Sequence, residues 1–331
     1  MKILLPLLQR LNPERAHDLG LMGLKCISPL MNTPVAPAHL AVHCCNLNFA
    51  HPLGLAAGFD KNGDYLDALG RLGFAHIELG TVTPRPQPGN PKPRMFRIPQ
   101  QQALINRMGF NNKGVDHLVR QLKASQYAGV RGVSIGKNAD TAIENAHNDY
   151  VECFRKVYPH ADYVAVNVSS PNTLRLRELQ GHDGLERIIG ALMQERLKLA
   201  TQHAKQVPLL VKVAPDLEGE QIQALANHLK ALRVDGVIAT NTSTHLALLA
   251  PQLLNPEQGG LSGAPIHASS VNVIRLLRAN LGPSFPIIGV GGITDARHAL
   301  ATLKAGANLL QVYTGFAYRG ATLINEIIDA L

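Results

Sequence analysis

Tryptophan is absent from this 331-residue chain, and its four cysteines form neither a C-x-x-C pair nor a metal-ligand spacing. Cys44 and Cys45 are adjacent, which suits neither a disulfide nor a chelate, so we expect reduced thiols and a reducing compartment. The fourteen histidines form no H-E-x-x-H pattern. The sequence therefore predicts no bound metal ion.

Long apolar runs are also missing. A bilayer-spanning helix needs about 20 consecutive apolar residues, and the apolar stretch Ile3–Leu8 is soon broken by Arg10 and Asn12. That stretch is short for a signal peptide, and no cleavage site follows it. We therefore expect neither a spanning helix nor a secretory signal.

Acidic residues are outnumbered, since 32 lysines and arginines face 24 aspartates and glutamates, giving a formal charge of +8. A basic chain favours anionic partners such as nucleic acid, acidic lipid or acidic small molecules. No basic run is interleaved with aromatic residues, as a nucleic-acid surface would require. Nucleic acid is therefore the least expected of these partners.

The first thirty residues predict a pair of short helices. The second helix runs from Pro13 to about Ser28, with Asn12 as its N-cap and proline at its first position. Its apolar stripe is wider than an ordinary core face and comprises Ala16, Leu19, Gly23, Cys26 and Ile27, widened by Leu21, Met22 and Leu24. The pair carries Lys2, Arg10, Arg15 and Lys25. It is suited either to lie on an anionic membrane surface or to cap the main domain.

A regular rhythm begins at Leu53, after a proline-containing linker and a small hairpin in residues 31–52. Uniformly apolar strands alternate with helix-like stretches, which predicts a parallel sheet covered on both faces. Eight strands predict a (β/α)8 TIM barrel over residues 53–331. The alternative is an open doubly wound sheet, but no G-x-G-x-x-G opens the first unit. The expected strands are Leu53–Ala57, Ala75–Leu79, Val130–Ile135, Tyr163–Val168, Leu209–Val213, Gly236–Ala239, Pro286–Gly289 and Leu309–Tyr313, and the helices include Tyr65–Leu72, Gly114–Lys123, Ile188–His203, Glu218–Leu232, Ser269–Asn280 and Ala296–Ala305.

An irregular insertion, Pro84–Arg107, follows the second strand. Its many prolines forbid a helix or a central strand. Met95–Ile98 and Ala103–Ile105 are expected to pair as a small hairpin. Long loops at this end of a barrel usually carry function.

The stretch Tyr163–Thr173 reads YVAVNVSSPNT, a buried strand that breaks at once into polar residues. Polar side chains at the end of an apolar strand need partners, which a substrate can supply. Pro171 stiffens the turn and favours an extended Ser170 between the amides of Asn167 and Asn172. An ordinary strand-ending turn is the alternative interpretation.

Three features of the other strand ends narrow the chemistry. The sequences GVGGI and YTG follow the last two strands, where barrels usually bind phosphate. Lys61 and Lys212 stand at strand ends with few acids nearby in the sequence, so each needs an anion or a polarised carbonyl. Asparagine and threonine dominate these ends, which argues against a metal site or carboxylate-based hydrolysis and suits a flat polar heterocycle. These residues fit a flavin mononucleotide (FMN) enzyme, and equally a soluble phosphate-binding lyase that uses Lys212 as a Schiff base.

Ten segments in order resemble the motif set of the dihydroorotate dehydrogenase family. They span residues 56–316 and read AAGFDKNG (56–63), ELGTVTPRPQPGNPKPR (78–94), INRMGFNN (105–112), GKNADT (136–141), VNVSSPNT (166–173), VKVAPDL (211–217), IATNTS (238–243), GGLSGAP (259–265), IIGVGGI (287–293) and QVYTGF (311–316). The amino-terminal segment with NPERAH at 12–17 is similar to the membrane-associated, quinone-dependent class 2 enzymes. Ser170 in SSPN agrees, because class 1 enzymes carry SCPN there.

The resemblance implies oxidation of dihydroorotate to orotate in pyrimidine biosynthesis, with FMN as the bound hydride acceptor and a quinone as the final acceptor. Ser170 would take the proton from C5 of the substrate. The substrate would be held by Lys61, Asn106, Arg107, Met108, Gly109, Phe110, Asn172, Asn241 and Thr242. The flavin would be held by Ala57, Gly58, Thr81, Ser134, Asn167, Lys212, Thr240, Gly263, Gly292, Tyr313 and Thr314. His17 and Arg97 match the quinone-end positions.

One departure concerns Ser134, because class 2 relatives usually carry asparagine there, and serine reaches less far toward a flavin. We further expect a monomer that lies on an anionic membrane surface, peripheral to the cytoplasmic side of the inner membrane. We also expect deletion of residues 1–30 to spare the reduction of flavin by dihydroorotate while impairing quinone reduction.

Overall fold

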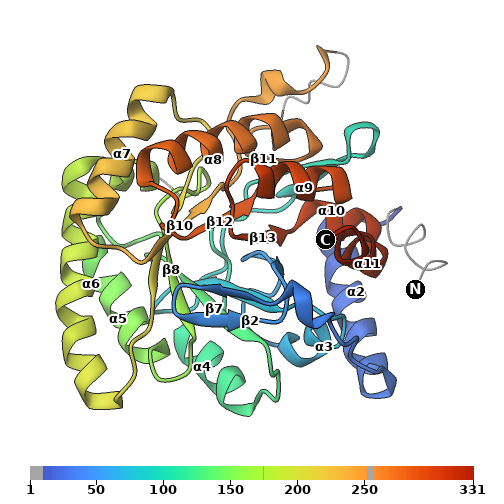
Figure 1. Ribbon diagram of the computed structural model, residues 1–331, viewed down its shortest axis with the longest axis horizontal. Coiled ribbons are helices and arrows are strands. Elements are labelled where there is room, and N and C mark those ends of the chain that lie inside the picture. Colours follow the sequence, from blue (N-terminus) through green and yellow to red (C-terminus); the bar gives the residue numbers. More distant parts are fainter. Residues whose placement is uncertain (1–9, 174, 252–256) are drawn as a thin grey trace.

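The computed structural model describes residues 10–173, 175–251 and 257–331. Its centre is a closed barrel of eight parallel strands (Figure 1). Neighbouring strands follow chain order around the barrel, and the last strand pairs with the first. The strands are β3 (Leu53–Leu55), β4 (His76–Val82), β7 (Val130–Ile135), β8 (Tyr163–Asn167), β9 (Leu209–Val213), β10 (Gly236–Ala239), β12 (Ile287–Val290) and β13 (Leu309–Val312). The predicted TIM barrel is confirmed.

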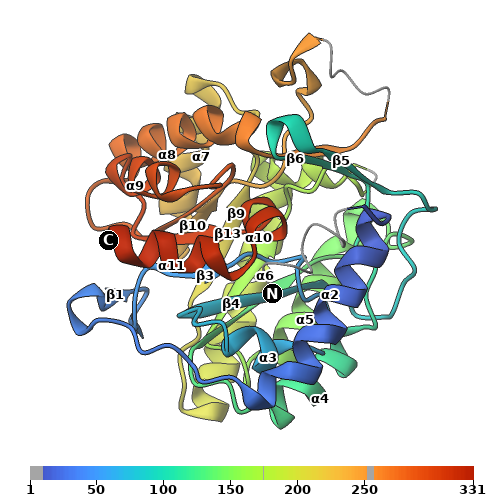
Figure 2. The same cartoon turned by 90° about the vertical axis from the view of Figure 1, so that its right-hand side faces the viewer.

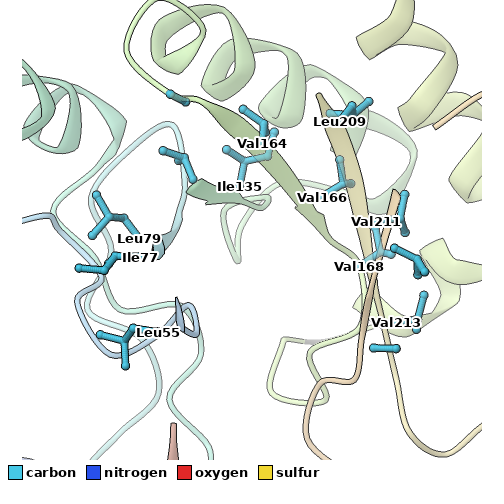
Figure 3. Close-up of a cluster of buried hydrophobic side chains, with 14 of the residues drawn as sticks. Leu55, Ile77, Leu79, Ile135, Val164, Val166, Val168, Leu209, Val211 and Val213 are labelled. Carbon is cyan, nitrogen blue, oxygen red and sulfur yellow. The ribbon is translucent and has the colours of Figure 1, made fainter. Parts of the chain in front are cut away.

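A ring of helices covers the outside of the barrel (Figure 1). Outward side chains such as Ile77, Val164 and Val211 are completely buried between strands and helices (Figure 3). Both faces of each strand are therefore apolar, which explains the uncharged runs in the sequence. The helices are α3 (Leu66–Gly70), α4 (Val115–Ala124), α5 (Ala146–Val157), α6 (His182–His203), α7 (Gly219–Ala231), α8 (His267–Leu281), α9 (Ala296–Lys304), α10 (Thr314–Arg319) and α11 (Ala321–Ala330).

The predicted boundaries differ from these by a few residues at most ends. The start of α6 is the largest difference, because it lies at His182 rather than Ile188. Helices α5, α10 and α11 were not among the expected elements. The buried residues of α5 recur at helical spacing, so the signal for this helix is present in the sequence. They are Ala146, Asp149, Tyr150, Cys153, Phe154 and Val157.

The amino-terminal end of the barrel is closed by the hairpin of β1 (Val42–Cys44) and β2 (Leu47–Phe49), as expected for Val42–Ala50. The Phe49 ring packs edge-on against His76 with centroids 5.3 Å apart. Gly54 makes room for His76, because a Cβ on Gly54 would lie 2.2 Å from the imidazole Nε2. His76 is fully buried, and neither ring nitrogen has a partner among the described residues.

A small antiparallel sheet covers one side of the opposite end of the barrel, where the strands have their carboxyl ends. It joins β5 (Met95–Ile98) to β6 (Ala103–Asn106), the hairpin expected within the insertion. A third strand, β11 (Gly260–Gly263), pairs with β6. That strand was not expected, because the sequence GLSG is too rich in glycine to suggest one.

Helix α2 (Pro13–Ile27) lies along the edge of the barrel beside α3 and β5 (Figure 2). The predicted N-cap is confirmed, since Asn12 Oδ1 accepts from the backbone N–H groups of Glu14 and Arg15. The apolar stripe predicted for this helix is covered only in part. Ala16, Leu21 and Leu24 are buried, whereas Leu19 and Ile27 are 50% and 43% exposed.

The expected first helix, Ile3–Leu8, lies outside the described residues. No helix in the described ranges is both long and apolar enough to cross a bilayer. The division into 1–30, 31–52 and 53–331 remains a prediction.

Candidate active site

A cleft with an empty volume of about 1010 Å³ opens at the carboxyl ends of the barrel strands. The catalytic candidate Ser170 and all but two of the substrate and cofactor candidates line it. These are Ala57, Gly58, Lys61, Thr81, Asn106, Met108, Gly109, Phe110, Asn167, Asn172, Lys212, Thr240, Asn241, Thr242, Gly263, Gly292, Tyr313 and Thr314. Parallel strands bring their ends to one face, which is why residues far apart in sequence meet here.

Ser170 is only 7% exposed at the turn after β8. Its Oγ accepts a hydrogen bond of 3.3 Å from the Asn172 backbone N–H, as expected for a turn stiffened by Pro171. Oγ therefore stays beside the cleft while the backbone turns away. The strand end is held from behind by Tyr150, whose hydroxyl donates to the Asn167 carbonyl at 2.9 Å.

Arg177 clamps this turn to the loop after β10. Its Nε donates to the Ser169 carbonyl at 3.1 Å, and its Nη2 donates to the Thr242 carbonyl at 2.9 Å. Its Nη1 lies 2.8 Å from the Asp216 carboxylate. Burial alone would raise the pKa of Asp216, but hydrogen bonds from Ser243, the Thr244 backbone and Arg177 keep that pKa below its ordinary value. The clamp is therefore charged at neutral pH.

Asparagine amides form two connected pairs in the cleft. Asn172 Nδ2 donates to Asn106 Oδ1 at 3.0 Å. Asn241 Nδ2 donates to Ser169 Oγ at 2.9 Å and to Asn167 Oδ1 at 3.2 Å. Each amide is oriented by a neighbour, so the cleft presents fixed donors and acceptors suited to a flat polar ligand.

Two candidates lie outside the cleft lining. Ser134 is fully buried behind Thr81, and their hydroxyls are 2.9 Å apart. Thr81 Oγ1 in turn accepts from Asn167 Nδ2 at 2.8 Å. The side chain of Ser134, which is shorter than the asparagine of class 2 relatives, thus supports Thr81 and does not reach the cleft itself.

Arg107 turns its side chain to the rim. Its guanidinium pairs with Glu257 at 2.5 Å and lies over the Phe96 ring, 4.9 Å from the centroid. The side chain of Arg107 therefore does not line the cleft, and a contact of this residue with the substrate remains a prediction.

Lys212 is not short of acidic neighbours, contrary to the expectation from the sequence. Its Nζ lies 3.4 Å from Glu78 Oε1 inside the barrel, where both side chains are buried. Glu78 Oε2 also accepts from Gln311 Nε2 at 2.9 Å and from the Tyr163 hydroxyl at 3.1 Å. An ion-paired ammonium has no free electron pair, so this geometry opposes the Schiff-base lyase.

Lys61 reaches into the cleft from the loop after β3, and its Nζ donates to the Gly58 carbonyl at 2.9 Å. Burial lowers the pKa of Lys61 to about 8, partly opposed by the negative charge of Glu14 on α2. A buried cation with one neutral acceptor is well placed to receive an anionic ligand.

The glycines of the last loops fit tightly against protein atoms. A Cβ on Gly292 would lie 2.5 Å from His267 Cα, and one on Gly263 would lie 2.1 Å from the Gln102 carbonyl oxygen. Packing alone therefore requires these glycines, so their presence does not by itself indicate phosphate.

Two buried atoms of the cleft lining give a better test of whether a cofactor fits. Gln311 Oε1 and Thr242 Oγ1 have no hydrogen-bond partner among the described residues. A bound ligand with hydrogen-bonding edges would satisfy such atoms, and the amides, hydroxyls and lysines of the lining are groups that suit a flat polar ligand such as a flavin.

A second, mostly apolar groove with an empty volume of about 2790 Å³ lies between α2 and the barrel. His17 and Arg97, the predicted quinone-end residues, both line it, and Tyr313 lines both this groove and the cleft. His17 Nε2 donates to the Phe59 carbonyl at 2.8 Å. Burial and the nearby charge of Lys61 lower the pKa of His17 to about 4, so the imidazole is neutral at physiological pH.

Some lining residues were not predicted, including Ser262, Ile266, Ile293 and Gln311. Gln311 and Glu78 did leave a signal, because each is a polar residue inside an apolar strand. Thr173 does not line the cleft, although its buried hydroxyl also has no partner among the described residues. Among those residues, His182, Glu186 and His228 are the only group spaced to hold a metal, and they lie outside the cleft lining.

Comparison with known proteins agrees with this geometry. Residues 39–331 match the family model described as dihydroorotate dehydrogenase. "Dihydroorotate dehydrogenase (quinone)" of Azotobacter vinelandii is 49% identical over 98% of this chain and 94% of its own, and that of Neisseria meningitidis is 49% identical over 97% and 96%.

The solved ligand-free dihydroorotate dehydrogenase of Eimeria tenella superimposes with a TM-score of 0.88 at 38% identity, over 96% of this chain and 93% of that one. Identity at this level over nearly the whole chain shows more than a shared fold. The chain belongs to the dihydroorotate dehydrogenase family and groups with its class 2 members.

Proposed function

We propose that this protein oxidises (S)-dihydroorotate to orotate in pyrimidine biosynthesis, with FMN as its bound cofactor and a membrane quinone as final acceptor. The observation that best supports this proposal is that Ser170, Lys61 and four asparagines line one cleft. Two other lining residues, Thr242 and Gln311, carry buried polar atoms without a partner among the described residues. Carboxylates and metal-ligating side chains are scarce in the lining of the cleft. The chemistry that suits this lining is therefore proton abstraction and hydride transfer.

The substrate end of the cleft has the groups that an anionic pyrimidine needs. Lys61 supplies positive charge for the orotate carboxylate, and Asn106, Asn172 and Asn241 supply amides for the ring. Ser170 would act as the base for the C5 proton, and the hydrogen bond that its Oγ accepts from the Asn172 N–H supports this role by fixing the side chain beside the cleft. Met108, Gly109, Phe110 and Thr242 complete this end.

The remaining candidates would hold the flavin, with Lys212 beside its pyrimidine edge, Thr81, Asn167 and Thr240 around the ring, and Gly263, Gly292, Tyr313 and Thr314 toward its phosphate. When bound, FMN supplies the hydride acceptor for substrate C6 and hands the electrons to the quinone. The ammonium of Lys212 favours negative charge near it. Ser134 contributes indirectly by fixing Thr81.

We also propose that quinone enters through the groove beside α2, past His17 and Arg97. Six of the nine exposed large apolar residues in the described chain lie between Leu11 and Val35, which supports contact of this end with a membrane. Arg10, Arg15 and Lys25 favour an anionic surface. The proposed location is peripheral, on the cytoplasmic side of the inner membrane, as a monomer.

The decisive experiment is an anaerobic absorption spectrum before and after dihydroorotate is added. Bleaching of a flavin band, followed by its return with a quinone, is the expected result. A flavin band that dihydroorotate leaves intact would refute the substrate, and a colourless protein that cannot be reconstituted with FMN would refute the cofactor.

A further inference from the structure

Arg94, in the insertion after β4, is a buried cation that joins helix α2 to the substrate end of the cleft. Its side chain is 6% exposed. Its Nη2 lies 2.6 Å from Glu14 Oε1, and its Nε donates to both oxygens of that carboxylate, at 3.2 and 3.3 Å. The remaining nitrogen, Nη1, donates to the carbonyls of Pro88 at 2.6 Å and Asn90 at 2.9 Å. One guanidinium thus fixes both the helix and the loop.

Asn90 carries the connection onward. Its Nδ2 donates to the Arg107 carbonyl at 2.9 Å and to the Asn172 carbonyl at 3.1 Å. Its backbone N–H donates to the Met108 carbonyl at 3.0 Å. Asn90 therefore ties the Asn106–Phe110 loop to the turn that carries Ser170, although it does not line the cleft.

Glu14 is the only group in this chain of contacts that belongs to the quinone-side helix. Burial alone would raise the pKa of Glu14, but hydrogen bonds to and charges of Arg94 and Lys92 hold that pKa below its ordinary value. Without the carboxylate, Arg94 would be a buried cation lacking its anion, a costly state that drives rearrangement. Rearrangement of Arg94 releases the loop at Asn90, so the Asn106–Phe110 loop no longer holds its substrate-binding groups in place, which weakens binding.

We propose that Glu14, Arg94 and Asn90 act as positioning residues for the first half-reaction, so that binding of dihydroorotate depends on helix α2. This inference rests on the proposed function. It changes the expectation that loss of residues 1–30 spares flavin reduction, because that deletion removes Glu14. The helix that frames the quinone groove thereby also supports the substrate site.

The test measures anaerobic flavin reduction by dihydroorotate in the full-length, flavin-loaded protein, with no quinone present. Because its binding groups are less well preorganised, we expect Glu14→Gln to raise the apparent Kd for dihydroorotate about five- to twentyfold, with less than about a twofold change in the limiting reduction rate. Glu14→Asp should recover part of the affinity. A general structural defect would instead lower flavin content or thermal stability without this separation of Kd from rate.

Lys92→Gln is the matched control. Lys92 pairs with the same carboxylate at 3.3 Å, but its side chain is 66% exposed, and within the described part of the chain it makes no ion pair or hydrogen bond with Asn90. Its removal should leave the Kd within twofold of wild type. Asn90→Ala should raise the Kd at least as much as Glu14→Gln does. The variant that carries both substitutions should have a Kd no higher than that of Asn90→Ala alone, because the effects of substitutions within one chain of contacts are not additive.

A Kd within twofold of wild type in Glu14→Gln, or additive effects in the double variant, would overturn the inference. If Glu14→Gln loses its flavin, the comparison of Asn90→Ala with Lys92→Gln replaces it. A Kd within twofold of wild type in Asn90→Ala would then overturn the inference. Failure of the proposed function would look different, because wild-type flavin would then not be reduced by dihydroorotate at all.

Discussion

Replacing Glu78 by glutamine should destabilise the barrel interior while keeping its shape. The carboxylate is completely buried and lies 3.4 Å from Lys212, which is itself 4% exposed. Removing one partner of a buried ion pair leaves an uncompensated charge and costs about 3–5 kcal/mol. The entropy of unfolding of a 331-residue chain is on the order of 0.7 kcal/mol per kelvin, so the expected loss in Tm is about 4–7 °C.

The assay is thermal unfolding of Glu78→Gln at a fixed scan rate, with and without bound FMN. The loss should be larger in the flavin-free protein, because a bound flavin offers the Lys212 ammonium another acceptor. Tyr163→Phe is the control, since it removes one neutral donor to the same carboxylate. That loss should be only about 1–2 °C, as expected for a hydrogen bond worth about 1 kcal/mol.

A Tm for Glu78→Gln within about 1 °C of wild type would refute the reasoning. It would mean that Lys212 finds another partner or water once the carboxylate is gone. An equal loss in the flavin-loaded and flavin-free forms would leave the ion pair intact as an explanation of stability. It would, however, remove Lys212 as a flavin contact.

Four further predictions follow from the same geometry. Ser170→Ala should keep its flavin but lose about 10²–10⁴-fold in the rate of flavin reduction by dihydroorotate, and near-normal turnover would remove Ser170 as the base. Arg177→Lys keeps the positive charge but loses the planar guanidinium that donates to the Ser169 and Thr242 carbonyls, so we expect turnover to fall about tenfold. Unchanged stopped-flow rates would show that Arg177 does not hold these two loops in place. Lys61 has a pKa of about 8, so its ammonium is lost as pH rises through that value and the Kd for dihydroorotate should then increase; Lys61→Arg should flatten this pH profile if the charge is responsible. Burial lowers the pKa of His76 to about 3, so the unfolded chain takes up a proton below about pH 6.5 that the folded chain refuses. The free energy of unfolding should therefore fall with decreasing pH, and His76 should account for on the order of 3 kcal/mol of this loss at pH 4. In urea titrations, His76→Leu should lose less stability in acid than wild type does. An unchanged loss of stability in acid would contradict this role of His76.

The barrel was predictable because its strands are buried on both faces. That burial leaves uncharged runs ending in polar residues, and parallel topology then sends those ends to one face. Most candidate residues consequently line one cleft. Long-range pairing was not predictable. Nothing in the local sequence shows that Glu78 meets Lys212, because that contact depends on which residues of two strands share a layer inside the barrel.

The misplaced details have similar causes. Arg107 belongs to a motif that lines the cleft, yet its side chain turns to Glu257, a partner 150 residues away. In α2 an apolar stripe lies opposite a polar side with Glu14, Asp18 and Lys25, but the spacing does not show which part of the stripe a neighbouring element covers. Helical spacing identifies a stripe only when the opposite face is polar.

Closure of the barrel has a consequence for how the protein is made. Strand β3 pairs with β13, so residues 53–55 stay unpaired on that side until the ribosome has made residues 310–312. At ribosomal rates of about 5–20 residues per second, that interval lasts roughly 13–50 s. During it the nascent chain exposes unpaired apolar strand edges, and neither Tyr313 nor the rim strand Gly260–Gly263 has joined the cleft. A flavin cannot be captured early in synthesis, and the growing chain is most vulnerable to aggregation just before its last sixth emerges.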